Sequence, residues 1–329
     1  MALPPPAAPW TRQGKRPPEI APVLPPEPHR GREEPDAPKD APMSAWTDLV
    51  QFLFAGVTAG AIYALVALGF GVVHNTMGIV NFTQVDFVSL GGMLLYSALH
   101  SGGLPAPLAL AAAVAGVTLV AVMVEVLGVR PSRSESHLVL IFLTIGLSII
   151  LRGAMKLIWG KNRMAVPPLS GENFWTLGGA TILVQTVWII GLTAAAIVGL
   201  VWFFRRTDLG LAMRAVAANE RAAAVVGLRV WRVKAASFAL AGALGGLAGA
   251  LITPITTLAY DVGVLLGLKG FAAAILGGFG SFPGAIVGGI LLGLLESLAA
   301  GYLSSAYKDV LAFVVLVGVL FVRPRGLLG

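Results

Sequence analysis

The chain contains no cysteine, and few of its residues carry a charge. The missing cysteine excludes disulfide bonds, cysteine-ligated metals and a thiol nucleophile. Charged residues make up 12% of the 329 residues and hydrophobic residues 57%, whereas ordinary soluble proteins are about one quarter charged. Because so few polar side chains cannot cover a water-exposed surface, the composition predicts a protein whose solvent is lipid.

The signatures of common enzyme classes are also missing. No Gly-x-x-x-x-Gly-Lys-Ser/Thr loop occurs, so we expect that the chain does not hydrolyse ATP itself. A membrane-embedded enzyme would need polar groups clustered at one depth, and the scattered Asp86, Glu125 and Glu296 do not form such a cluster. We therefore expect neither enzymatic activity nor a cofactor.

The first residues differ in composition from the rest. Residues 1–42 hold 13 of the 21 prolines, and no apolar periodicity runs through them, which predicts a disordered, proline-rich tail over residues 1–43. Residues 44–329 are then expected to form the transmembrane domain. The segment 43–48, which starts with Met43, immediately precedes the first apolar run. Either translation begins at Met43 or the tail is real and dispensable.

Beyond the tail, the chain is a series of long apolar runs. Each run approaches the roughly 20 residues that cross a bilayer as a helix, and the runs are continuous rather than alternating, which favours helices over a barrel. We predict an all-α integral membrane protein, a polytopic bundle of about eight or nine transmembrane helices. The expected spans are 49–73, a short one ending at 99, 104–124, 138–159, 181–204, 235–260, 263–280, 283–301 and 304–322.

Basic residues predict the orientation of the spans. The net charge is +7. A nucleic-acid partner is not expected, because the sequence has no dense basic patch interleaved with aromatic residues. Range 205–234 holds seven basic and two acidic residues, which predicts a cytoplasmic loop. Arg323 and Arg325 place the C-terminus on the same side, and the N-terminus of the bundle then lies outside. Lys161 and Arg163 would lie on the outer side in this orientation, which the rule disfavours. The excess of basic residues is larger in range 205–234, so that range decides the orientation.

Polar groups interrupt the apolar runs at two places. Asn81, Gln84 and Asp86 follow the first span, and such groups are costly in hydrocarbon unless they face a cavity or one another. They are our candidates for a solute path, and the alternative is a turn at the membrane surface, wetted by water. Lys269 and Glu296 lie within apolar spans and either pair with each other or reach the interface.

The long basic loop carries the clearest functional signal. It is rich in alanine from 207 to 228, a strong helix former, so it predicts a short helix with Asp208 and Asn219 as N-caps and Gly227 as C-cap. Such a helix either docks into a groove of a partner protein or lies on the inner membrane surface.

The loop contains a spaced set of small and polar residues, namely Gly210, Arg214, Ala215, Ala218, Asn219, Ala222 and Gly227. With these residues the loop resembles the cytoplasmic coupling loop of ABC importer permeases, more specifically those of the high-affinity branched-chain amino-acid (Leu/Ile/Val) transport family. Ranges 267–285 and 323–329 are similar to signatures of the same family, and the likeness runs from about Asp48 to the end. This chain departs from the family pattern before Asp86, where the family commonly has glycine and this chain has Val85; Thr83 also adds a hydroxyl.

The resemblance implies partners, location and cargo. It implies separate ATP-binding ABC subunits docked on the loop, a second homologous permease, and a periplasmic or extracellular solute-binding protein. It also implies a multi-pass protein surrounded by lipid in the bacterial cytoplasmic (inner) membrane. Branched-chain amino acids are the expected solutes. Urea or short amides are alternative cargoes, and an ion-coupled secondary transporter is an alternative class.

Glycines recur every four residues in the last third of the chain. Gly280, Gly284 and Gly288 form one such row, and Gly289 and Gly293 form another. Small residues at this spacing let helix backbones approach closely in lipid. The rows therefore predict tight packing between helices.

Overall fold

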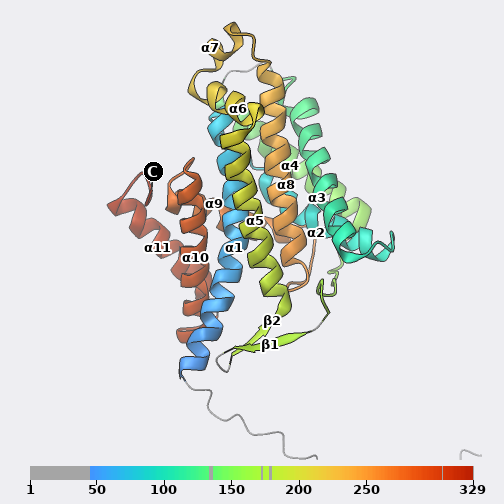
Figure 1. Cartoon of the computed structure of the whole chain (residues 1–329), viewed down its shortest axis with the longest axis vertical. Coiled ribbons are helices and arrows are strands. Elements are labelled where there is room, and N and C mark those ends of the chain that lie inside the picture. Colours follow the sequence, from blue (N-terminus) through green and yellow to red (C-terminus); the bar gives the residue numbers. More distant parts are fainter. Residues whose placement is uncertain (1–44, 133–135, 172, 178–179, 306, 329) are drawn as a thin grey trace, which may run out of the picture. The chain divides into compact units, whose positions relative to one another are not determined.

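Helices account for most of the part of the chain that the structure, a computed structural model, describes (Figure 1). This part comprises residues 45–132, 136–171, 173–177, 180–305 and 307–328, and the tail predicted for residues 1–43 lies outside it. The described residues belong to one unit, Met43–Gly329. In chain order the elements are α1 (Ala45–Met77), α2 (Gln84–His100), α3 (Ala106–Met123), the π-helix η1 (Val124–Val129), α4 (His137–Trp159), β1 (Phe174–Leu177), β2 (Ala180–Leu183), α5 (Val184–Arg206), α6 (Asp208–Ala218), α7 (Glu220–Val225), α8 (Val230–Ile252), α9 (Val262–Gly277), α10 (Phe282–Tyr302) and α11 (Lys308–Val322).

Six helices within the described ranges are long and apolar enough to cross a bilayer. They are α1, α3 with its η1 extension, α4, α5, α8 and α10. The other apolar helices are shorter, with 17 residues in α2, 16 in α9 and 15 in α11. The fold is thus a multi-pass helical membrane bundle, as predicted.

The structure corrects two predicted spans. The run 235–260 ends as a helix at Ile252, and Leu258 instead forms a β-bridge with Met164. Thr181 lies in strand β2 and not in a span, because β1 and β2 form an antiparallel hairpin that pairs Phe174 with Leu183. Aromatic and β-branched residues favour strands, and they supply most of this hairpin, which the all-helical prediction missed.

The predicted glycine rows bring helix backbones together. Helix α1 packs against α10, α8, α9 and α5. A Cβ atom on Gly60 would lie 2.7 Å from the Cα of Ile290, and one on Gly289 would lie 2.6 Å from the amide nitrogen of Ala64. Gly280 does not belong to the row: it precedes α10 and has a φ of +95°, so it forms a turn.

The loop 205–234 and the C-terminus lie at the same end of the bundle. Helices α6 and α7 sit at that end in Figure 1, and the hairpin and the start of α1 sit at the other. The side-chain nitrogen of Asn75 at the end of α1 donates to the carbonyl of Gly280 over 2.7 Å. The amide of Leu327 donates to the carbonyl of Leu276 in the last turn of α9 over 3.0 Å. This arrangement agrees with the orientation predicted from the basic residues.

Candidate functional site

Residues 207–228, which we call the coupling segment after the role that the resemblance implies, form two helices and not the single helix that was predicted. Asn219 separates them because its backbone is extended, with φ −161° and ψ 105°. Its side-chain oxygen accepts from the amide of Ala222 over 2.9 Å, so Asn219 is the N-cap of α7, as predicted. The N-cap of α6 is Thr207 and not Asp208, because the Thr207 hydroxyl accepts from the amide of Gly210 over 3.0 Å.

Two glycines of the coupling segment have different physical roles. Gly210 is buried where α6 turns back on the end of α5, and a Cβ there would lie 2.8 Å from the Cα of Phe204 and would overlap the carbonyl of Phe203. The C-cap of α7 is Val226 and not Gly227 as predicted. Gly227 is the next residue, and its φ of +91° is a conformation that glycine adopts without strain. One glycine thus sets the packing of α6, and the other ends α7.

The outer face of the coupling segment carries most of the predicted contact residues. Arg214 and Asn219 are exposed, while Gly210 is buried and Ala215 is half-buried. Ala218, Ala222 and Gly227 are exposed as well.

The apolar tip of this face was not predicted from the sequence. Val225 is 86% exposed and Val226 is 77% exposed. Two adjacent β-branched residues immediately before the terminating glycine were the available signal, because a helix end at the surface cannot bury both. The tip is an apolar surface that the described part of the chain leaves uncovered.

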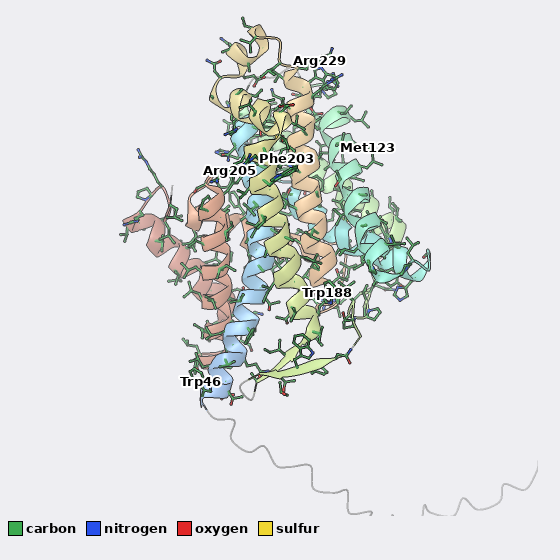
Figure 2. All side chains as sticks on the ribbon, in the orientation of Figure 1. Trp46, Met123, Trp188, Phe203, Arg205 and Arg229 are labelled. Atoms are coloured by element: carbon green, nitrogen blue, oxygen red, sulfur yellow. The ribbon has the colours of Figure 1, made fainter. Side chains whose placement is uncertain are left out.

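A cavity of about 500 Å³ lies beneath α6. The end of α1, the end of α5 and the start of α10 close it, and Arg205 and Arg214 line it. Figure 2 shows Arg205 and Arg229 at the end of the bundle that carries α6 and α7, and Trp46 at the opposite end. The coupling segment therefore lies over a basic hollow.

The predicted path residues lie side by side at the start of α2 and are fully buried. The side-chain oxygen of Asn81 accepts from the amide of Thr83 over 3.1 Å and from its hydroxyl over 2.6 Å. The side-chain nitrogen of Gln84 donates to the carbonyl of Ala241 in α8 over 3.2 Å. Gln84 fits between Gly69 of α1 and α8, because a Cβ on Gly69 would overlap its amide.

Asp86 binds to α4. Its carboxylate accepts from the Nε of Arg152 over 3.0 Å and also from the hydroxyl of Ser148. Thr144, Ser148 and Arg152 recur every four residues and so form one polar stripe on α4, and the Thr144 hydroxyl accepts from the amide of Phe82 over 3.1 Å. This spacing was visible in the sequence, but the stripe was not predicted to face Asp86.

Val85, the departure from the family pattern, packs where α9 has no side chain. It is 5% exposed, and a Cβ on Gly267 would lie 2.5 Å from the Cβ of Val85. The branched side chain thus occupies space that Gly267 leaves open. The helix begins at Gln84 and continues through Val85 without a break.

Of the two alternatives for Lys269 and Glu296, the structure shows the salt bridge between them. The Lys269 Nζ lies 2.6 Å from one carboxylate oxygen of Glu296 and 2.7 Å from Asp309 at the start of α11. The hydroxyl of Tyr63 in α1 donates to the other oxygen of Glu296 over 2.6 Å. The buried charges are therefore neutralised within a network that joins α1, α9, α10 and α11.

Comparison with known proteins adds the identity of the family. The family model described as "Branched-chain amino acid transport system / permease component" matches residues 52–320. Permease proteins named LivH, for high-affinity branched-chain amino acid transport in Salmonella typhimurium and Escherichia coli, are each 34% identical to this chain. Each alignment covers 85% of this chain and 95% of the relative. The corresponding permease BraD of Pseudomonas aeruginosa is also 34% identical, with the same coverage.

These matches span the membrane bundle, the coupling segment and the buried polar cluster, and they confirm the resemblance read from the loop. The family is one of transport permeases and not of enzymes. The chain belongs to the family of permease components of branched-chain amino acid transport systems.

Proposed function

We propose that this permease forms the translocation path for branched-chain amino acids in an ABC importer powered by separate ATPase subunits. The observation that carries the proposal is the coupling segment. Two capped helices are fixed to the end of α5 through Gly210, and they expose Val225 and Val226 at the most basic end of the bundle. A rigid helical knob with an apolar tip suits a groove on a partner protein.

The orientation follows from the positive-inside rule. We place α6, α7 and the C-terminus in the cytoplasm and the hairpin outside, in a bacterial cytoplasmic membrane. If α2, α9 and α11 also cross, nine crossings result, and the start of α1 lies outside. The span count of eight or nine thus depends on these three short helices. Residues 44–329 form the transmembrane permease domain in this proposal.

The exposed faces of the bundle suit a second, homologous permease and lipid. On helix α4, Phe142 is 70% exposed, Ile150 68% and Leu157 88%. Exposing such an apolar face to water is unfavourable. We expect a paired permease to cover part of this apolar surface and lipid to cover the rest. A solute-binding protein would dock at the hairpin end.

We infer that the solute path passes the start of α2. Asn81, Gln84 and Asp86 supply amide and carboxylate groups deep within the bundle, where α1, α4 and α8 meet α2. ATP-driven closure of the ATPases would pull on the coupling segments and bias the helices between outward-facing and inward-facing states. In that movement α2 would slide past α4, and the contact of Asp86 with Arg152 would open.

Co-purification tests the coupling proposal. We expect the tagged wild-type permease to retain its co-expressed ATPase, and Arg214→Glu and Gly227→Trp to lose it while they remain folded. Asp261→Asn is a matched control, because Asp261 is exposed at the hairpin end before α9. If both variants retain the ATPase as well as the wild type does, the coupling segment is not the docking element, and a secondary transporter becomes the better proposal.

Solute uptake tests the cargo. Proteoliposomes with the full importer and its binding protein should take up labelled leucine, isoleucine and valine only when ATP is supplied. Excess urea or acetamide should not compete. Competition by urea or acetamide at the concentration at which valine competes would shift the assignment to short amides.

A further inference from the structure

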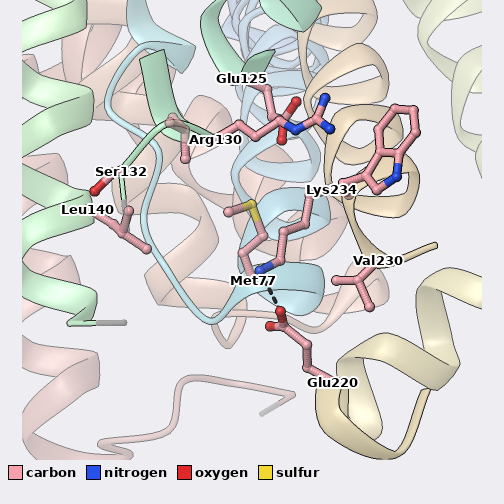
Figure 3. Close-up of a pocket in the computed structure, with 10 residues that line it drawn as sticks. Met77, Glu125, Arg130, Ser132, Leu140, Glu220, Val230 and Lys234 are labelled. Carbon is pink, nitrogen blue, oxygen red and sulfur yellow. Dashed lines mark hydrogen bonds and ion pairs between the residues drawn. The ribbon is translucent and has the colours of Figure 1, made fainter. Parts of the chain in front are cut away.

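The permease holds a second cavity that the transport path does not use. It has a volume of about 300 Å³ and lies between the end of α1, η1, the start of α4, α7 and the start of α8 (Figure 3). Pockets that bind small molecules occupy roughly 300–1,000 Å³, so this cavity suits a molecule of a few heavy atoms. It lies at the end of the bundle that carries the coupling segment.

Four charged side chains line the cavity, and their charges cancel. Glu125 lies in η1, and Arg130 is the residue that follows η1. The other two, Lys234 of α8 and Glu220 of α7, form an ion pair over 2.6 Å. The guanidinium of Arg130 stacks over the ring of Trp231 with a separation of 4.4 Å. Two acids and two bases disfavour a phosphate, and they suit a ligand that itself carries one charge of each sign.

Glu125 indicates where the positive end of the ligand binds. The residue is 1% exposed, and its Oε2 has no hydrogen-bond partner within the described residues. Leaving a buried carboxylate oxygen unpaired is costly, and such groups in native proteins are normally satisfied. No group of three or more His, Asp or Glu side chains suited to a metal occurs in the described ranges, which favours an organic ammonium group.

The π-helix brings the acid and a base to the same wall. The amide of Arg130 donates to the carbonyl of Glu125, five residues earlier, over 2.7 Å. This wider turn carries both side chains into the cavity lining (Figure 3). Single π turns within α-helices are frequently found at functional sites. A guanidinium presents parallel donors that match a carboxylate, so Arg130 suits the negative end of the same ligand.

The rest of the lining is mainly apolar. Met77, Val129, Leu140 and Val230 supply it, together with Ser132, whose side chain is polar. An ammonium, a carboxylate and an apolar branch on one small molecule describe a free aliphatic α-amino acid. We propose that this cavity is a binding site for such an amino acid on the cytoplasmic side, separate from the translocation path.

The position of the site suggests its effect. A ligand held by Glu125 and Arg130 would lie against Glu220 of α7 and Lys234 of α8, and so would fix the coupling segment to the bundle. The accumulated product of import would thereby slow the importer. This inference rests on the proposed orientation and solute class, and a binding assay tests it separately from transport.

The experiment uses the complete importer complex, purified without its solute-binding protein and held in nanodiscs. Equilibrium binding of labelled L-leucine should saturate at one site per copy of this chain. Neither 4-methylpentanoate, which lacks the ammonium, nor 3-methylbutylamine, which lacks the carboxylate, should compete at the concentration at which leucine does.

Three variants locate the site. Glu125→Gln should weaken binding at least about ten-fold, because it removes a charge-assisted contact. Leu140→Trp should abolish binding by filling the cavity without a change of charge. Asp261→Asn, which removes a carboxylate outside the cavity, should bind as the wild type does. If either cavity variant fails to assemble, the other decides the location.

The outcomes separate the two proposals. Absence of saturable leucine binding in a complex that imports leucine overturns the cytoplasmic site and leaves the proposed function standing. Unchanged binding in Glu125→Gln and Leu140→Trp also overturns it. If the importer transports a different solute, the proposed function fails, and the binding assay with leucine still decides whether the cavity holds an aliphatic amino acid.

Discussion

Lys269 offers the sharpest test of the packing described above. Its ammonium lies between Glu296 and Asp309, at 2.6 and 2.7 Å, and its side chain is 6% exposed. Within the described part of the chain, Lys269→Met leaves the buried Glu296 with the Tyr63 hydroxyl and the more distant Lys308, 3.8 Å away, as its remaining partners. The substitution therefore uncovers a buried negative charge.

The size of the loss follows from the partners. Removing one member of a buried ion pair costs about 3–5 kcal/mol, and Tyr63 still donates to Glu296, so we expect about 3 kcal/mol. The pair with Asp309 adds little, because the Asp309 side chain is 40% exposed and exposed pairs contribute about 0–1 kcal/mol. Lys269→Met/Glu296→Leu removes both buried charges and should be more stable than Lys269→Met alone.

Thermal unfolding of the purified permease, followed by the fluorescence of its 7 tryptophans, measures these differences. The midpoint of Lys269→Met should fall by roughly 5–10 °C, and that of the double variant should fall by less than the sum of the single changes. Asp261→Asn serves as the exposed control. Additive losses in the double variant would contradict this prediction, because they would mean that Lys269 and Glu296 do not compensate each other.

Further substitutions test other contacts. Arg152→Leu should lower the unfolding midpoint more than Arg152→Lys does, because Asp86 is fully buried beside it; equal losses would contradict the ion pair. Gly60→Ala should cost about 1–3 kcal/mol through overlap with α10. Its control Gly199→Ala, whose Cβ meets nothing within 4 Å, should be neutral or slightly stabilising. Gly227→Ala should strain the end of α7 by about 1–2 kcal/mol, because alanine disfavours the positive φ of Gly227. The expected readout is weaker retention of the ATPase in co-purification. Full retention would show that docking does not require this backbone conformation.

Much of the fold could be predicted from local sequence. Each long apolar run forms a helix, because lipid offers no hydrogen-bond partners and the backbone N–H and C=O groups must bond to one another. The bounds of α4 and α10 fell within two residues of the predicted runs 138–159 and 283–301. Asn219 was also predictable as a cap, because a short amide followed by Glu and alanines is a local signal for a helix start.

The candidate site was predictable only in part. Residues of the coupling segment were chosen from a loop pattern, and one local feature, the extended backbone of Asn219, split it into two helices. The hairpin was missed because strands of four residues are too short to show periodicity. The cavity beside Glu125 was also missed, because its walls come from helices that are far apart in the sequence.

Composition and local patterns were enough to predict that this chain is a membrane protein, which end of the bundle is basic, and to which family it belongs. These properties depend on composition and on patterns within one segment. The packing of the helices was needed to establish that Asp86 binds Arg152 and that Lys269 lies between two acids. It also showed that Glu125 has an oxygen without a partner among the described residues, in a cavity that Arg130 lines as well. Partners of buried charges are chosen by how helices pack, and packing brings together residues that no local pattern connects.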